Sequence, residues 1–165
     1  IDDFAYTPQQ NIGHAMTTLM AQNKGAGKHD RVNQGFHCGM RIEAVYGILI
    51  AVVCFAGAPA IMKMFVTDPA VIELGVRFLR TVSLFYLMPA FTNGIQGFFR
   101  GIGDLQVTLV SSTINMVGRV FAAAVFVLWW KMEIEALPYS YVFGWALMLL
   151  YEVPMLVRYL RSHEM

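Results

Sequence analysis

Residues 44–62 read AVYGILIAVVCFAGAPAIM and contain no Asp, Glu, Lys or Arg. Roughly 20 helical residues, each rising about 1.5 Å, are needed to cross the ~30 Å hydrocarbon core of a bilayer. Comparable uncharged stretches recur along the chain at residues 4–23, 81–99, 105–118 with 120–130, and 136–151. They leave too little chain for a water-soluble core, so the sequence predicts an all-α integral membrane protein.

The overall composition supports this fold class. The chain is 57% hydrophobic and 14% charged, whereas an average soluble domain is about 25% charged. The formal net charge is +1 and the basic residues form no stripe, so no nucleic-acid partner is expected. Cys38 and Cys54 lie in or beside apolar segments and do not make a disulfide framework. The expected partner at this level is the lipid bilayer.

About five transmembrane helices account for the apolar stretches. They are expected at about residues 4–23, 38–66, 70–99, 104–131 and 137–160. A short interfacial helix over residues 31–43 leads into the second span. Asp68 is expected to cap the third helix, with Pro69 in its first turn. Pro89 is expected to kink that helix and to leave a free backbone carbonyl.

The distribution of Lys and Arg gives an orientation in the cell membrane. The first loop, Arg100 and the C-terminal segment carry most of the basic charge. On the opposite side are Lys63 and Lys131, plus Arg77 and Arg80 early in the third helix. The positive-inside rule then places the C-terminus in the cytoplasm and Ile1 outside. Residues 1–3 lack the basic region of a signal peptide. We therefore expect a piece of a longer multi-pass protein, with further helices upstream.

Three of the expected helices carry a polar stripe. In the first, the stripe comprises Gln10, Asn11, His14, Thr17, Thr18 and Gln22. In the third, it comprises Tyr86, Pro89, Asn93, Gln96 and Arg100, and in the fourth Ser112, Asn115 and Arg119. Polar groups at bilayer depth mark either pathways or contacts between helices. For single residues packing is the simpler interpretation, but three stripes together predict a water-accessible cavity.

Cation or proton binding has few candidates in this sequence. His14 is the one titratable side chain well inside the first helix, and an imidazole suits a proton-coupled step. A neutral histidine bonded to a neighbouring helix is the alternative. Asp2 and Asp3 lie at the outer end of the same helix. They either attract cations or are simply solvated.

No motif for catalysis or cofactor binding is present in the sequence. The histidines and cysteines lack HExxH or CxxC context for a metal, and no GxSxG elbow occurs. The Gly25-Ala26-Gly27-Lys28 run is not followed by Ser or Thr, so it is not a phosphate-binding loop. We expect neither an enzyme nor a resident metal or cofactor.

Two segments resemble motifs of a known transporter family. The first runs from Gln9 to Gly35 and includes Gly13, Ala15, Gln22-Asn23, GAGK at 25–28 and Asp30-Arg31-Val32. The second, GFFRGIGD at 97–104, is similar to a G-x-x-R-G-x-G-D loop, and Arg119 follows at a matching distance. Together and in this order they resemble the multidrug and toxic compound extrusion (MATE) family over essentially the whole chain.

The resemblance implies most of one six-helix lobe of a twelve-helix transporter, namely helices eight to twelve. One further helix and the N-terminal lobe would be missing. The implied function is efflux of small amphipathic, often cationic, organic compounds in exchange for sodium ions or protons by alternating access. Some sodium-coupled members carry a carboxylate midway along the helix that corresponds to the third span. Residues 81–99 contain none.

The implied site residues fall into two groups. The expected cavity residues are Gln10, Asn11, His14, Thr18, Phe85, Tyr86, Asn93 and Gln96. The expected motif and inner-gate residues are Gln22, Gly25, Gly27, Lys28, Arg31, Arg100, Gly101, Gly103, Asp104 and Arg119. Within the second group, Arg31, Arg100 and Asp104 are expected to pair across the loops. Cation or proton candidates remain Asp3 and His14.

Two other functions compete with multidrug efflux. A lipid-linked oligosaccharide flippase of the same broader superfamily would need a more cationic cavity than Arg119 alone supplies. A non-transporting membrane scaffold would not need the spacing of the polar residues.

Overall fold

The computed structural model describes the backbone of residues 2–132 and 136–163, and side chains within residues 5–132 and 136–162. Within these ranges the fold is all-helical, which confirms the predicted fold class. Six helices follow one another: α1 Asp2–Gly25, α2 His29–Phe65, α3 Pro69–Ser83, α4 Leu87–Ile102, α5 Leu105–Leu128 and α6 Ala136–His163.

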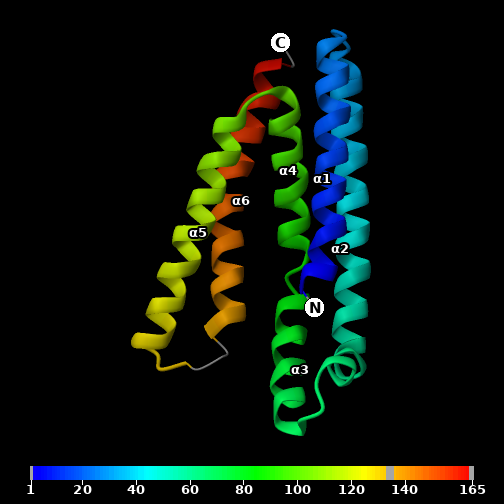
Figure 1. The fold of residues 1–165 in the computed structure, drawn as a ribbon. Coiled ribbons are helices and arrows are strands. Elements are labelled where there is room, and N and C mark those ends of the chain that lie inside the picture. Colours follow the sequence, from blue (N-terminus) through cyan, green and yellow to red (C-terminus); the bar gives the residue numbers. More distant parts are fainter. Residues whose placement is uncertain (1, 133–135, 164–165) are drawn as a thin grey trace.

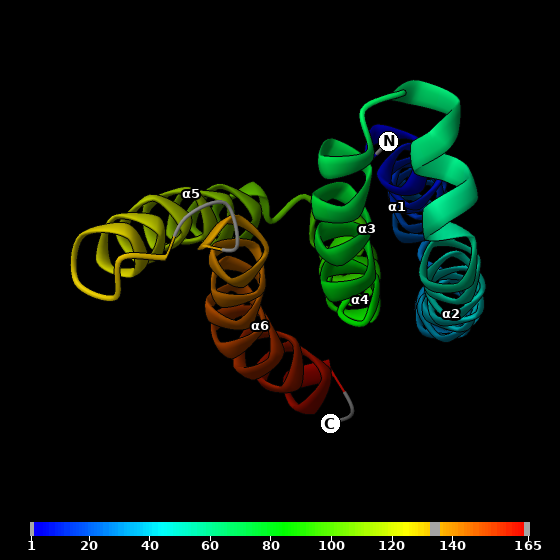
Figure 2. The same ribbon diagram turned by 90° about the horizontal axis from the view of Figure 1, so that it is seen from below.

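The helices form two groups that meet at α4. Helix α1 packs along α4 and against α2, and α3 packs below α4 against the lower part of α2 (Figure 1). Helices α5 and α6 form an antiparallel hairpin that leans away from the first group (Figures 1 and 2). The α1–α2 turn, the α4–α5 turn and the C-terminal end of α6 lie at the same end of the molecule. The basic segments expected on one side of the membrane are therefore at one end.

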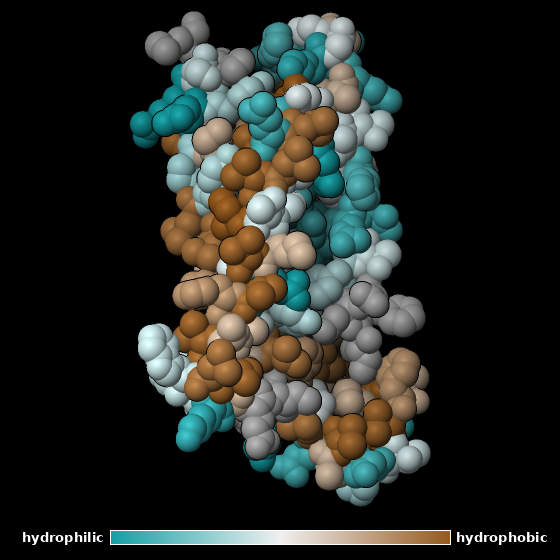
Figure 3. All heavy atoms as spheres, turned by 60° about the vertical axis from the view of Figure 1, so that its left-hand side comes forward, coloured by the Kyte–Doolittle hydropathy of each residue, from teal (hydrophilic) through white to brown (hydrophobic). Residues whose placement is uncertain are grey.

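Three helices of the described chain are long and apolar enough to cross a membrane. These spans are His29–Phe65, Leu105–Leu128 and Ala136–Ser162. Large apolar side chains such as Val45, Val52, Met116 and Leu150 are exposed on them, as expected for surfaces that face lipid. Figure 3 shows this apolar surface in brown and a hydrophilic surface in teal beside it.

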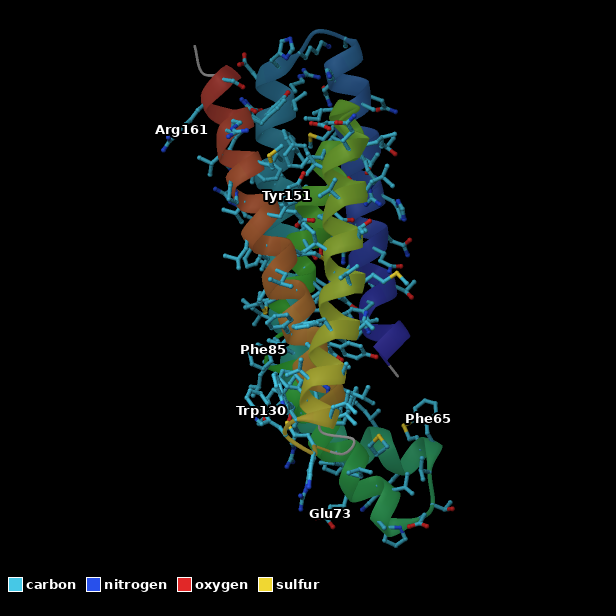
Figure 4. All side chains as sticks on the ribbon, turned by 90° about the vertical axis from the view of Figure 1, so that its left-hand side faces the viewer. Phe65, Glu73, Phe85, Trp130, Tyr151 and Arg161 are labelled. Carbon is cyan, nitrogen blue, oxygen red and sulfur yellow. The ribbon has the colours of Figure 1, made fainter. Side chains whose placement is uncertain are left out.

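The single helix expected over residues 70–99 is two helices in the structure. Helix α3 ends at Ser83 and α4 begins at Leu87, with a turn between them. The break precedes Pro89, which has no N–H to bond the carbonyl of residue 85. The expectation of a free carbonyl is wrong, because the Phe85 oxygen accepts the Met88 N–H at 2.9 Å. In Figure 4, Phe85, beside the break, lies above Phe65 and Glu73.

Helix α2 also differs from the expectation. No separate interfacial helix covers residues 31–43, because α2 is continuous from His29 to Phe65. Its first turns pack on α1: a Cβ atom at Gly35 would lie 2.8 Å from Leu19, and one at Gly39 would lie 2.5 Å from the Met16 sulfur. The absence of side chains at these glycines lets the segment lie against α1 rather than along the membrane surface.

The start of α3 follows the prediction. The Asp68 Oδ1 atom accepts the Ala70 N–H at 2.8 Å, and Pro69 is the first helical residue. The carboxylate satisfies one of the backbone donors left open at a helix N-terminus.

Candidate functional site

A cavity of about 290 Å³ lies between four helices in the middle of the molecule. Its walls come from α1, α4, α5 and α6, and most of its lining side chains are polar or aromatic. The lining residues are Tyr6, Gln10, Pro89, Thr92, Asn93, Gln96, Ser112, Asn115, Arg119, Trp145 and Met148. Figure 2 shows the α5–α6 hairpin diverging from α1 and α4, the four helices that supply the lining residues.

The structure brings together polar residues from the three predicted stripes. Gln10 of α1, Asn93 and Gln96 of α4 and Arg119 of α5 all line the cavity. Asn11, His14, Thr18 and Gln22 do not line it and are exposed along α1. The expected contribution of two aromatic residues is not seen, because Phe85 does not line the cavity and Tyr86 is fully buried in the core.

Gln96 connects the cavity to a buried carboxyl group. Its Nε2 donates to Glu152 Oε1 of α6 at 3.1 Å and to the Ser111 hydroxyl of α5 at 3.2 Å. Glu152 and Ser111 are fully buried. Glu152 Oε2 has no hydrogen-bond partner among the described residues. Three helices thus share one polar contact just behind the cavity wall.

The site predicted from the sequence did not include two carboxyl groups that the structure buries, those of Glu152 and Glu43. Glu152 interrupts an otherwise uncharged apolar segment, which is a signal that sequence reasoning can use. Glu43 is fully buried in α2, and a Cβ atom at Gly94 of α4 would lie 3.6 Å from its Cγ. Both Glu43 oxygens lack hydrogen-bond partners among the described residues. The polar sequence around Glu43 suggested an interface, so nothing in the sequence marked its burial.

Arg119 lies at the α5 wall of the cavity. Its Cζ atom is 3.8 Å from the centroid of the Tyr141 ring of α6. This stack is a cation–π contact. One helical turn earlier, Asn115 Nδ2 donates to the Met148 sulfur at 2.8 Å. Arg119, which the sequence places both in the polar stripe of the fourth span and among the motif residues, lines the cavity.

Close contact between two backbones positions the α1 and α4 walls. A Cβ atom at Gly97 would lie 2.5 Å from the Gly13 oxygen, and one at Gly101 would lie 2.7 Å from the Thr17 oxygen. The Thr17 hydroxyl donates to the carbonyls of Gly13 at 3.0 Å and Gly97 at 3.1 Å. The small residues therefore serve helix packing, as in other membrane helix pairs.

The helix break is tied to α1 as well. Gln9 is fully buried and its Nε2 donates to the Tyr86 carbonyl at 3.3 Å. Tyr86 also makes an edge-to-face contact with Tyr6, with ring centroids 5.5 Å apart. Tyr6 and Pro89 both line the cavity, so the break shapes one of its walls.

The expected inner-gate pairing is not formed in this structure. Arg31, Arg100 and Asp104 take part in no ion pair with described residues, whose one ion pair joins Glu73 and Arg77. Arg100 is half-buried, and its Nε has no partner in the described chain. At the same end, Lys24 Nζ donates to the Ile102 carbonyl and so links α1 to α4.

The motif glycines have different local roles. Gly27, in the turn after α1, and Gly103, the C-cap of α4, have φ angles of +70° and +87°. Glycine adopts this left-handed conformation without strain. Gly25 is the last residue of α1 and has open space around it. Lys28 precedes α2 and is exposed. These residues lie away from the cavity.

The cation candidates do not form a cluster in the described chain. The side chain of Asp3 lies outside the described residues, and His14 is exposed on α1. Among the residues that the structure describes, no three His, Cys, Asp or Glu side chains gather as a metal-binding group.

An all-helical membrane bundle that encloses a polar cavity is typical of a membrane transport protein. The MatE family model matches residues 1–125, and the chain belongs to this family. The resemblance in the sequence motifs is thereby confirmed.

Two relatives are named as probable multidrug resistance proteins. The chain is 21% identical over 116 residues to "Probable multidrug resistance protein NorM" of Thermotoga maritima, over 70% of this chain and 25% of that protein. It is 26% identical over 109 residues to the protein of the same name from Bacillus cereus, over 66% of this chain and 24% of that protein. The chain thus spans about a quarter of these relatives.

A solved structure shares the fold. It is described as the inward-facing conformation of a multidrug resistance MATE family transporter of the MOP superfamily. The TM-score is 0.84 at 13% sequence identity, and the match covers 88% of this chain and 33% of the other. The chain therefore has the fold of about one third of such a transporter.

Proposed function

We propose that this chain is most of the C-terminal lobe of a multidrug efflux antiporter. The complete protein would export small amphipathic, often cationic, organic compounds in exchange for sodium ions or protons by alternating access. Family membership and the names of the relatives support this function. The observation that carries it is the polar cavity between α1, α4, α5 and α6, in a bundle whose α2, α5 and α6 have apolar outer sides.

The proposal assigns parts of the complete transporter to this chain. Helices α1 and α2 correspond to the eighth and ninth helices, α3 with α4 to the tenth, and α5 and α6 to the last two. The N-terminal lobe would supply the second half of the cavity. The C-terminus would lie in the cytoplasm, at the end where the basic turns gather. No enzymatic step is part of this function.

The site residues take roles within this proposal. Gln10, Asn93 and Gln96 would contact substrate, because they line the cavity. Asn11, His14 and Thr18 would face the second lobe, because they are exposed on the polar side of α1. His14 and Asp3 remain the candidates for the coupling cation or proton in this lobe, and the ion itself is sodium or H⁺.

Transport by the complete protein tests the proposal. The full-length gene is expressed in cells that lack other efflux pumps, and a fluorescent amphipathic cation is added outside everted vesicles prepared from them. An imposed sodium or proton gradient should drive its movement, and replacement of Asn93 by Leu should slow that movement several-fold. The matched control is Thr113→Val on the exposed face of α5. If the fluorescence of the wild-type vesicles does not change when the gradient is imposed, antiport is contradicted.

The flippase alternative predicts a different result from the same vesicles. Such a protein would move a lipid-linked oligosaccharide and leave the amphipathic cation in place. Arg119 is the one basic residue among those that line the cavity. A single cation is less than a polyanionic lipid headgroup requires, which favours multidrug efflux.

A further inference from the structure

Arg119 is the charged residue among those that line the cavity, and its guanidinium group forms no ion pair with a described residue. The residues that line the cavity include this one arginine and no Asp or Glu. The one ion pair of the described residues joins Arg77 and Glu73 on α3. An arginine stays protonated in proteins, and an unpaired cation in the middle of a membrane helix is energetically unfavourable. Its position therefore favours an anion that enters the cavity.

The local packing holds the guanidinium group for such an anion. One face lies over the Tyr141 ring, with 3.8 Å between Cζ and the ring centroid. The stem passes Gly144 of α6, where a Cβ atom would lie 2.4 Å from Arg119 Cγ. Stacking on a ring occupies a face of the guanidinium and leaves its N–H groups in the plane available. Such a fixed planar fork matches both oxygens of a carboxylate.

The rest of the lining suits the remainder of an amphipathic molecule. Asn93, Gln96 and Ser112 offer neutral hydrogen-bonding groups, while Trp145 and Met148 offer apolar surface. Because this half of the cavity contains no acidic side chain, it provides no counter-charge for a cationic group. This lobe is therefore suited to bind the acidic group of a substrate rather than a cationic one.

We propose that Arg119, stacked on Tyr141, binds the carboxylate of acidic or zwitterionic amphipathic substrates. This inference rests on the proposed efflux function and names the substrate group that the lobe recognises. Tyr141 acts as a positioning residue, because it touches the guanidinium and is not among the cavity-lining side chains.

A matched acid and ester pair tests the proposal by binding rather than by transport. The probes are 11-(dansylamino)undecanoic acid and its methyl ester, titrated against the detergent-solubilised full-length protein. The wild type should bind the acid at least tenfold more tightly than the ester, and Arg119→Gln should remove that preference while changing the Kd of the ester less than twofold. Arg119→Lys should retain part of the preference, because the charge remains without the planar fork.

Two further variants separate binding from structure. Tyr141→Leu should weaken binding of the acid and leave binding of the ester unchanged, because the guanidinium loses its support. Arg80→Gln is the matched control: Arg80 also stacks on an aromatic ring, 5.6 Å from the centroid of Phe55, but it lies outside the cavity. The Arg80→Gln protein should prefer the acid over the ester to the same extent as the wild type does.

The possible results distinguish failure of the Arg119 proposal from failure of the proposed efflux function. A wild type that binds the ester as tightly as the acid overturns the role of Arg119 and needs no variant to do so. Equal loss of both probes in Arg119→Gln also overturns it, since the arginine would then serve folding or an internal ion pair. If gradient-driven export of cationic amphipaths persists in either case, the proposed function stands without this inference.

Discussion

At the scale of the residue, the most consequential contact is the one between Gln96 and Glu152. It joins residues that are 56 positions apart and fully or nearly buried. A buried carboxyl group without a hydrogen-bond partner is expensive, and Gln96 supplies one of the few available donors. The contact therefore ties α4 to α6 directly behind the cavity, where a substrate that touches Gln96 would disturb it.

Removal of one partner of the Gln96–Glu152 hydrogen bond should lower the stability of the protein more than removal of both partners. Gln96→Leu leaves the Glu152 carboxyl group buried without its amide donor and should destabilise the protein by about 1–3 kcal/mol. The double variant Gln96→Leu with Glu152→Leu should recover part of that loss, because no buried polar group is left alone. The midpoints of thermal unfolding of the detergent-solubilised full-length protein measure both. A double variant that is less stable than the sum of its single variants would contradict the pairing.

At the scale of the element, the approach of α1 to α4 sets the width of the cavity. Gly13 and Gly97 meet backbone to backbone, and Thr17 bonds the Gly97 carbonyl across the interface. In lipid there is little hydrophobic drive between helices, so such close packing and its hydrogen bonds carry the association.

A single methyl group at this contact should therefore be harmful. Gly97→Ala places a Cβ atom 2.5 Å from the Gly13 oxygen, and we expect a loss of about 1–3 kcal/mol from overpacking. Gly25→Ala is the control, because nothing lies within 4 Å of a Cβ atom there and an exposed change of this kind is worth about 0.5 kcal/mol or less. Thermal stability in detergent should rank wild type and Gly25→Ala together, well above Gly97→Ala. An equal effect at both glycines would show that α1 and α4 are not in close contact.

At the scale of the whole molecule, the chain is about a third of the solved transporter that it matches. The polar side of α1 and the cavity mouth are exposed, whereas the outer sides of α2, α5 and α6 are apolar. Figure 3 shows both kinds of surface on one face. Such asymmetry is what a lobe requires if a second lobe completes the cavity and lipid covers the rest.

The orientation in the membrane can be checked on the complete protein. A green fluorescent protein fused after Met165 should fluoresce, and alkaline phosphatase at the same place should be inactive, because the positive-inside rule places this end in the cytoplasm. Reporters inserted at Thr67, in the α2–α3 turn at the opposite end of the molecule, should give the reverse result. The same reporter signal at both positions would show that the segment from α3 to α6 does not cross the membrane as proposed.

The sequence by itself determined the membrane environment, the helical class, the position of the polar stripes and the Asp68 cap of α3. These features follow from local composition and spacing. Charged side chains are unfavourable in the bilayer core, and a carboxylate can cap a helix only when it lies next to the first helical turn in the sequence. The family signature is local in the same sense, since it lies in two short motifs near helix ends.

Only the tertiary structure decided which polar groups share a site. It divided the expected third span into α3 and α4, extended α2 through the expected interfacial helix, and buried Glu43 and Glu152. It also stacked Arg119 on Tyr141 of α6, a contact that no sequence pattern predicts. The physical reason is that these outcomes depend on pairs of residues far apart in the chain, and no local pattern records which helix faces will meet.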